Sequence, residues 1–142
     1  MNILVSACLL GIACRYDGAS KGLPEDVLRA LMARHTLVPA CPEQLGGLPT
    51  PRAPSERHGS RIVMRTGADV TDAYTRGAQQ TLALAQRFGC TAALLKQRSP
   101  SCGKGEIYDG TFTPDDGVAA ALLSAHGIRV YGEDDVAELL NL

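Results

Sequence analysis

The sequence carries almost no net charge and contains no long apolar segment. Its 14 lysine and arginine residues nearly balance its 15 aspartate and glutamate residues, so the formal net charge is −1. No overall field therefore attracts the chain to nucleic acid or to an anionic membrane, although a local patch could still bind nucleic acid. No apolar run approaches the roughly 20 residues of a membrane span, and residues 1–8 lack the basic leader of a secretion signal. We therefore expect a cytoplasmic protein without a membrane partner.

The sequence also lacks the closely spaced cysteine pairs of a typical structural zinc site. The five cysteines are Cys8, Cys14, Cys41, Cys90 and Cys102. None of them forms a Cys-x2-Cys pair. In a reducing cytoplasm, cysteines serve metal, cluster or catalytic roles before disulfides. Cys90 opens an apolar segment directly after Gly89, so we expect it to be a buried structural thiol. The other four cysteines lie in loop sequence that contains glycine or proline.

Alternation of apolar segments with glycine and proline indicates an ordered α/β protein. The 142 residues, 45% of them hydrophobic, can form a core without disulfides, and we expect one domain over residues 1–142. Short apolar segments predict strands at 2–5, 36–39, 92–95 and 128–131, and periodic segments predict helices at 24–35, 71–88, 117–126 and 134–140. Strands separated by helices imply a mainly parallel sheet with helices on both faces, a three-layer arrangement like that of Rossmann and flavodoxin folds.

The segments between these elements give further predictions. We expect residues 62–64 to form a small hairpin with the short segment that follows the turn at 66–68. We expect residues 106–111 to pair locally. Thr71 is the expected N-cap of the helix that begins there. Residues 6–21 and 41–48 are expected to be loops. Residues 49–60 are polar and rich in proline, so we expect no core element there. We expect the arginine-rich segment around Arg52, Arg57 and Arg61 to be a solvated flap.

Three of the cysteines are expected at one edge of the sheet. Cys8 follows the first predicted strand, Cys41 the second and Cys102 the third. Because sites in parallel sheets collect at the carboxyl ends of the strands, these three thiols should converge there. Three thiolates can hold an iron–sulfur cluster or zinc, or can act as redox thiols, and the spacing leaves all three possibilities open. A cluster held by three thiolates keeps one iron free to bind a substrate.

The segment after the third strand, residues 94–109, carries the richest set of chemical groups. Ser99, Ser101 and Cys102 are nucleophilic or ligating groups within it. Its glycines, Gly103 and Gly105, allow the backbone to approach another group closely. Three cationic side chains make the neighbourhood positive, namely Lys96, Arg98 and Lys104. This segment is therefore the expected centre of the site.

Several ordered motifs carry a resemblance to a known family. They are Ser6–Gly11, Cys14–Gly18, Cys41–Glu43 with Gly46–Leu48, Pro51–Arg52, Leu95–Lys96, Ser99–Gly103 and Ile107–Gly110. In these motifs the chain resembles the bacterial family once known only as domain of unknown function 523, whose characterised members are thiouracil desulfurases. The similarity extends over nearly the whole chain.

The resemblance implies an enzyme that depends on a [4Fe-4S] cluster. Cys8, Cys41 and Cys102 match the positions of the three cluster ligands. Cys14 stands where family members can have valine, so it lines the pocket or packs, and a ligand role for it stays open. Glu43 and a serine match the proposed catalytic groups; Ser99 is favoured, and Ser101 remains the alternative. All of these residues belong to the motifs given above.

The resemblance also implies a small thiolated nucleobase or nucleoside as the substrate. Similar domains occur fused to a second domain in proteins that act on thiolated transfer RNA. This chain ends without that extension. We therefore expect a free base or small nucleoside, and we regard nucleic acid as an unlikely partner.

The chemistry that these groups support is hydrolysis of a carbon–sulfur bond. An iron with a free position binds the soft sulfur of a thiocarbonyl and acts as a Lewis acid. Water then attacks the ring carbon with Glu43 as general base, and 4-thiouracil or 2-thiouracil becomes uracil and hydrosulfide without net electron transfer. The alternative is a sulfur carrier, a redox protein or a zinc-stabilised module without desulfurase turnover.

Each of these polar residues also has a purely structural interpretation. Glu43 could cap a local turn or pair with Arg52, and the two serines could satisfy backbone groups of their loop. Asp17 and Asp109 each stand in a Tyr-Asp-Gly triplet. We expect both of these aspartates to be turn residues first and site residues second.

Overall fold

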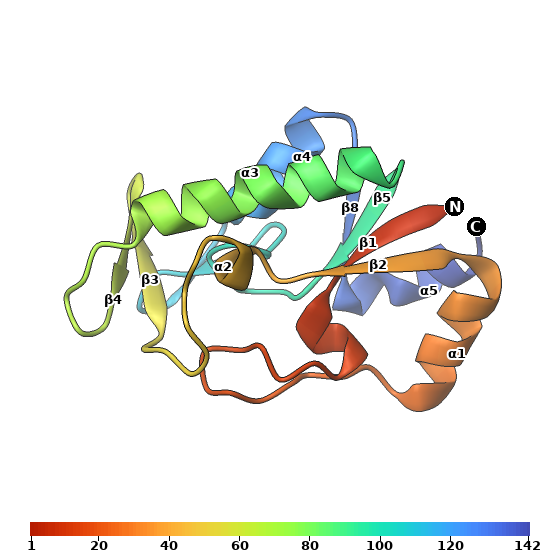
Figure 1. Ribbon diagram of the computed structural model, residues 1–142, viewed down its shortest axis with the longest axis horizontal. Helices are drawn as coiled ribbons and strands as arrows, with labels where there is room; N and C mark the ends of the chain where they lie inside the picture. Colours follow the sequence, from red (N-terminus) through yellow and green to blue (C-terminus); the bar gives the residue numbers. More distant parts are fainter.

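Four parallel strands form the central sheet (Figure 1). The computed structural model describes residues 1–142. The strands are, in chain order, β1 (Asn2–Ser6), β2 (Thr36–Ala40), β5 (Ala92–Leu95) and β8 (Arg129–Gly132). They pair in the order β2-β1-β5-β8, and every neighbouring pair is parallel. The predicted α/β architecture is therefore confirmed, with all four predicted strands present.

Helices cover both faces of this sheet (Figure 1). One face carries α1 (Glu25–Arg34) and α5 (Val136–Leu140), and the other carries α3 (Thr71–Arg87) and α4 (Val118–Ala125). Side chains of β1 alternate between two apolar clusters: Leu4 packs with residues of α3 and α4, whereas Ile3 and Val5 pack with residues of α1 and α5. Because both faces of the strands are apolar, both need a helical cover. None of the helices combines the length and hydrophobicity that crossing a bilayer requires.

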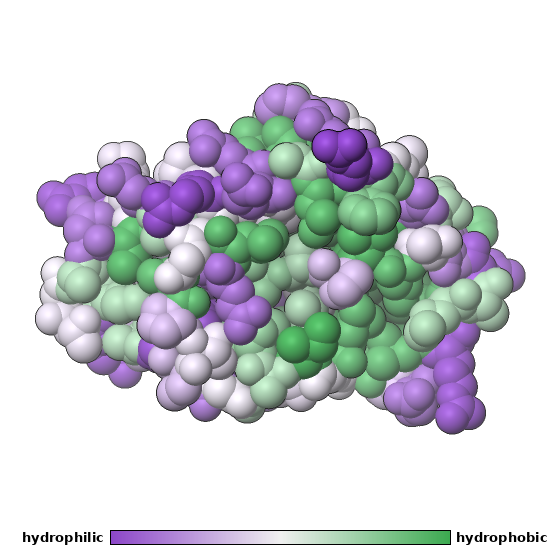
Figure 2. Space-filling view, in the orientation of Figure 1, coloured by the Kyte–Doolittle hydropathy of each residue, from purple (hydrophilic) through white to green (hydrophobic).

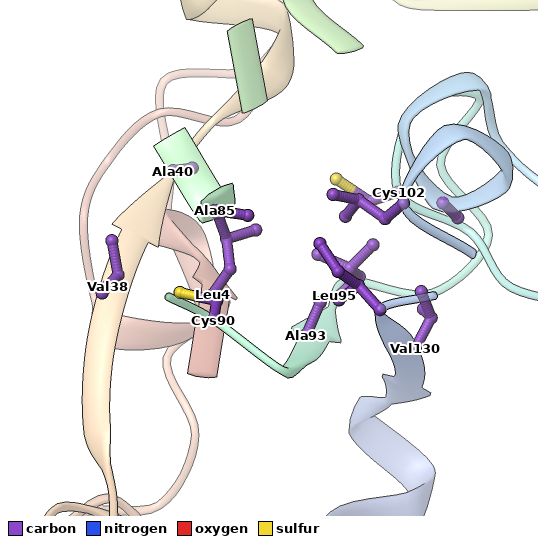
Figure 3. Close-up of a cluster of buried hydrophobic side chains, with 12 residues drawn as sticks. Leu4, Val38, Ala40, Ala85, Cys90, Ala93, Leu95, Cys102 and Val130 are labelled. Atoms are coloured by element: carbon purple, nitrogen blue, oxygen red, sulfur yellow. The ribbon is translucent and has the colours of Figure 1, made fainter. Parts of the chain in front are cut away.

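The cluster beneath α3 and α4 contains Cys90, which was expected to be structural. Cys90 is buried there with Leu4 and Ala85, and Figure 3 shows it well separated from Cys102 within the same cluster. Burial raises the pKa of the Cys90 thiol. The prediction of a buried structural thiol is confirmed by this position.

Strand β2 lies at the edge of the sheet and contains a proline. Pro39 pairs in register with Val5 of β1, and no further strand adjoins its other side. An edge strand tolerates proline because one row of its backbone groups makes no ladder hydrogen bonds, and proline there discourages further pairing. Figure 2 shows hydrophobic side chains over the middle of the face where β2 lies, below the more hydrophilic surface along α3.

Two small hairpins flank the carboxyl edge of the sheet. The first consists of β3 (Ser55–His58) and β4 (Arg61–Met64), and the second of β6 (Ile107–Tyr108) and β7 (Phe112–Thr113). The sequence predicts that residues 62–64 form a hairpin with the segment that follows them, but their main partner is a different strand. They pair with the preceding β3, and the following segment adds one bridge, between Val63 and Asp69. The two-residue turn between β3 and β4 contains Gly59 at φ 62°, which is a hairpin geometry that the prediction overlooked.

Three local predictions are corrected by the structure. The segments expected to be loops contain helical turns, η1 (Ala7–Leu10) and α2 (Pro42–Leu45). Pro42 occupies the first position of α2, where its missing N–H costs nothing. Thr71 is not an N-cap: it is the first residue of α3, and its hydroxyl oxygen accepts a hydrogen bond from the Ile62 N–H at 2.8 Å. Thr71 therefore joins α3 to β4.

Helix α2 is held against α3 by a contact between two glycines. A Cβ atom on Gly77 would lie 1.9 Å from the Pro42 carbonyl oxygen, and one on Gly46 would lie 2.0 Å from the Ala73 carbonyl oxygen. Distances this short exclude any side chain at either position. The two helices therefore approach until their backbones touch, and this contact fixes the place of Glu43 on α2.

We expect Gly77→Ala to lower the free energy of unfolding by about 1–3 kcal/mol, because the methyl group must push α2 and α3 apart. An alanine would otherwise favour a helix interior. Urea denaturation measures the change. Gln80→Ala, at an exposed position of the same helix, is the control and should change stability by less than about 0.5 kcal/mol. Equal stability of Gly77→Ala and the wild type would contradict the proposed contact.

Candidate functional site

A cavity of about 400 Å³ lies at the carboxyl edge of the sheet. Its walls include residues that follow three adjacent parallel strands: Cys8 after β1, Cys41 after β2 and Ser99 after β5. Residues 14–16 and parts of both small hairpins complete the walls. Open α/β sheets place their ligand sites at this edge, next to the strand where the chain changes direction across the sheet. Strand β1 occupies that position, because β2 pairs with one side of it and β5, the next strand of the sheet along the chain, pairs with the other.

Four cysteines line this cavity. Cys8, Cys41 and Cys102, which the sequence predicts to converge, all face it, and Cys14 joins them. The Cys41 thiol donates to the Cys14 carbonyl oxygen at 3.8 Å. Cys8, Cys14 and Cys102 are buried, whereas Cys41 is half-buried. The structure thus brings together residues that lie up to 94 positions apart, from Cys8 to Cys102.

The environment of these thiols opposes ionisation. Burial raises the pKa of Cys8 to about 11 and the pKa of Cys14 and Cys102 to about 12. For Cys8 and Cys14, the neighbouring thiol of Cys41 adds to this effect. Thiolates are the form that binds iron or zinc, and a bound cationic centre favours deprotonation. The donor set therefore fits a soft, positively charged centre.

The spacing of the side chains bears on the size of such a centre. No three cysteine, histidine, aspartate or glutamate side chains lie close enough together to hold a single metal ion. A polynuclear iron–sulfur cluster separates its thiolate ligands by its own iron and sulfide atoms, so it does not need them to converge on one point. The four thiols of one cavity are therefore compatible with the ligand set of a cluster.

Glu43 is the carboxylate of the cavity wall, and three side chains hold it. Its Oε1 atom accepts hydrogen bonds from the Tyr74 hydroxyl at 2.8 Å and from Arg52 Nε at 3.2 Å. Its Oε2 atom accepts one from the Ser101 hydroxyl at 3.2 Å. The ion pair with Arg52 that the sequence left as a structural alternative is therefore present. It does not remove Glu43 from the cavity, which both residues line.

The solvated flap predicted for the arginines is wrong for Arg52. Its side chain is only 2% exposed, and it donates to the carbonyl oxygens of Cys14 and Pro49 as well as to Glu43. Arg57 and Arg61 lie outside the cavity wall, paired with Asp115 and Asp69. Arg52 thus belongs to the site, because it joins the loop of Cys14 to the carboxylate.

The two candidate serines occupy different positions. Ser99 lines the cavity, whereas Ser101 is fully buried behind it. The two hydroxyl oxygens lie 2.9 Å apart, so they form a chain from Ser99 through Ser101 to Glu43. The Ser99 oxygen also accepts the backbone N–H groups of Ser101 and Cys102 at 3.1 and 3.2 Å. Ser99 is therefore the serine that a bound molecule can reach, and Ser101 connects it to the carboxylate.

Two of the three cationic side chains predicted around residues 94–109 lie at the cavity. Lys96 and Arg98 line it, whereas the Lys104 ammonium donates to the Val130 carbonyl oxygen. Lys96 is itself paired with Glu133 at 2.6 Å. Lys96 and Arg98 thus reach the cavity wall, each paired with acidic side chains, and Lys104 points to the backbone of β8.

Sequence reasoning did not identify Tyr74 as a residue of the site. Tyr74 lies on α3, 1% exposed, one helical turn before Gly77 and Ala78 on the same buried face. A tyrosine on an otherwise small-residue helix face is a signal for a buried hydroxyl with a specific partner. Nothing in the local pattern reveals that the partner is Glu43.

Comparisons with known proteins agree with this geometry. The family model described as 2-thiouracil desulfurase matches residues 3–135. Uncharacterized protein YbbK of Bacillus subtilis (strain 168) is 43% identical over 152 aligned residues, which cover 97% of this chain and 99% of YbbK. The solved structure of the [4Fe-4S]-dependent thiouracil desulfidase TudS is 48% identical, with a TM-score of 0.91, and the match covers 97% of this chain and 94% of that chain.

We expect Tyr74→Phe to lower the free energy of unfolding by about 1.5–3 kcal/mol, because it removes a buried hydrogen bond to a carboxylate. Urea denaturation provides the measurement. Tyr131→Phe is a matched control, since Tyr131 is also buried, at 4% exposed, and its hydroxyl has no carboxylate partner. If both variants lose the same stability, the bond to Glu43 carries none of the effect.

Proposed function

Because this chain belongs to the 2-thiouracil desulfurase family, we propose that it is an iron–sulfur enzyme that removes sulfur from a thiolated pyrimidine by hydrolysis. The observation that carries the proposal is that Cys8, Cys41 and Cys102 line one cavity together with Glu43. The substrate is a small thiolated base or nucleoside such as 4-thiouracil or 2-thiouracil. One water is consumed, and the products are uracil and hydrosulfide.

In this proposal, Cys8, Cys41 and Cys102 hold a [4Fe-4S] cluster. Support comes from their place on the cavity wall and from TudS, which is named as [4Fe-4S]-dependent. We assign Cys14 to the cavity wall and not to the ligand set. All five cysteines are free thiols, as expected in the reducing cytoplasm where we place the activity.

When bound, the cluster supplies a thiophilic Lewis acid for the thiocarbonyl sulfur. The carboxylate of Glu43 then accepts a proton from the attacking water as general base. Arg52 and Tyr74 both donate to Glu43 Oε1. These bonds leave Oε2, which faces the serines, as the oxygen that takes up the proton.

The serines provide a path for that proton and a contact for the substrate. Because the Ser101 hydroxyl donates to Glu43, the hydrogen of Ser99 is donated to Ser101, while the Ser99 oxygen accepts two backbone N–H groups. Donation by Ser99 to the ring would replace its bond to Ser101. Ser101 donates to Glu43 Oε2 at 3.2 Å. We therefore assign the substrate contact to Ser99 and the positioning of Glu43 to Ser101.

Anaerobically reconstituted protein should be brown, contain about four irons per chain and convert 4-thiouracil to uracil and hydrosulfide in equal amounts. Cys8→Ser, Cys41→Ser and Cys102→Ser should each lose iron and turnover, because each removes one thiolate ligand. Iron, sulfide and uracil are measured on the same samples.

Two cysteine variants serve as controls for this experiment. Cys90→Ser changes a buried thiol of the core, and Cys14→Ser changes a thiol of the cavity wall; both should keep the iron. Colourless protein that retains zinc, or turnover that survives Cys41→Ser, would refute the proposed function.

Glu43→Gln should retain the cluster but lower kcat by about 10²–10⁴-fold, because an amide cannot accept the proton of water. Steady-state turnover of 4-thiouracil and the iron content are compared with the wild type, and circular dichroism verifies the fold. The control is Glu25→Gln, whose side chain is 75% exposed on α1, and its kcat should not change. Full activity in Glu43→Gln would remove Glu43 from the mechanism.

A further inference from the structure

One buried hydroxyl in the cavity wall has no hydrogen-bond partner. Ser55, the first residue of β3, is 8% exposed and lines the cavity. Its Oγ is the only buried side-chain nitrogen or oxygen in the protein without a hydrogen bond. The Tyr74 hydroxyl lies nearby, and its own proton is donated to Glu43. Buried polar groups are nearly always paired, so an unpaired hydroxyl beside a cavity is a candidate for contact with a bound molecule.

Aromatic side chains are concentrated around the same cavity. The chain has four tyrosines and two phenylalanines, and four of these six line it, namely Tyr16, Tyr74, Tyr108 and Phe112. Phe112 is 58% exposed, so it contributes little to any core. Its ring lies against that of Tyr108, with 5.6 Å between the ring centroids. Tyr16, Tyr108 and Phe112 together are called the aromatic rim below.

Each of the two tyrosines of the aromatic rim precedes a turn of the same kind. Tyr16–Gly18 and Tyr108–Gly110 are the two Tyr-Asp-Gly triplets of the sequence. In each, the aspartate accepts the backbone N–H two residues ahead at 3.0 Å. The glycines have φ angles of 75° and 101°, which other residues rarely adopt. The aspartates are thus turn residues, as predicted, and each turn brings its tyrosine to the cavity.

A flat ring with a polar edge fits these groups. Aromatic side chains stack on any base, because every base presents a π face. A serine hydroxyl can donate to a ring carbonyl or accept from a ring N–H. The thiolated pyrimidine of the proposed function has both features. Ser55 and the aromatic rim share one cavity with the four cysteines.

On the basis of the proposed function, we propose that Ser55 and the aromatic rim form the binding site for the pyrimidine ring. The Ser55 hydroxyl hydrogen-bonds the polar edge of the ring, and Tyr16, Tyr108 and Phe112 contact its faces. These residues, together with the contact from Ser99, set the affinity for the base, whereas Glu43 accepts the proton of the attacking water.

Ser55→Ala provides a sharp test, because the two possible roles of this hydroxyl give opposite results. We expect the dissociation constant for uracil, measured by anaerobic calorimetry on cluster-loaded protein, to rise about fivefold. The KM for 4-thiouracil should rise in parallel, with kcat within about twofold of the wild type. The midpoint of thermal unfolding should not fall, since the mutation removes an unpaired buried group.

Phe112→Ala should weaken uracil binding and raise KM by roughly tenfold, the loss expected when one base–aromatic stack is removed. Phe88→Ala is the matched control, because Phe88 is also exposed, at 52%, but lies at the end of α3 and outside the cavity wall. Its KM, kcat and uracil affinity should equal those of the wild type.

The site is overturned if Ser55→Ala loses stability while uracil affinity stays unchanged, or if Phe112→Ala behaves like Phe88→Ala. Uracil carries no sulfur, so its binding is measured without turnover. Failure of the wild type to release hydrosulfide from 4-thiouracil would refute the proposed function, whereas normal turnover with unaltered KM in both variants would refute only the assigned ring site.

Discussion

The parallel pairing of β1 with β2 and β5 determines where the thiols that follow these strands lie. The register places Ser6 opposite Ala40 and Val5 opposite Leu94, so the three strands end at nearly the same level. Cys8 and Cys41 follow within two residues of these ends. A register shift of one residue would turn alternate side chains to the other face of the sheet. The apolar clusters on both faces resist such a shift, and the position of the thiols therefore depends on the core.

Glu43 depends on a second constraint, which is the close approach of α2 to α3. The short helix α2 positions the carboxylate, and Tyr74 and Arg52 supply donors to a single oxygen of it. Because the Arg52 side chain is almost fully buried, neither member of this ion pair can be removed without leaving the other uncompensated. The structural and chemical roles of Glu43 are thus compatible: the pairing fixes one oxygen, and the other remains in contact with the serines.

The sequence predicts the parallel sheet and the convergence of thiols because both follow from local regularities. Apolar periodicity marks the strands, and residues directly after parallel strands share one edge. The burial of Arg52 and the contact of Tyr74 with Glu43 have no such local mark. Arg52 is buried because it meets the Cys14 carbonyl from 38 positions away, and Tyr74 meets Glu43 from 31. The unpaired hydroxyl of Ser55 has no mark in the sequence either, because only the folded chain shows which buried polar groups lack a hydrogen bond.

The loop that carries Ser99, Ser101 and Cys102 is fixed by the start of α4. Backbone N–H groups of Val118 and Ala119 donate to the carbonyl oxygens of Pro100 and Ser101, both at 2.9 Å. These N–H groups have no partners within their own helix, so the loop and the helix end satisfy each other. A Cβ on Gly117 would lie 2.5 Å from the Ser101 backbone, which shows how closely the two segments pack. These backbone bonds, together with the bonds from the Ser101 and Cys102 N–H groups to the Ser99 hydroxyl, keep the serines and the thiol in place. A bound cluster would then add charge and chemistry without having to order the chain.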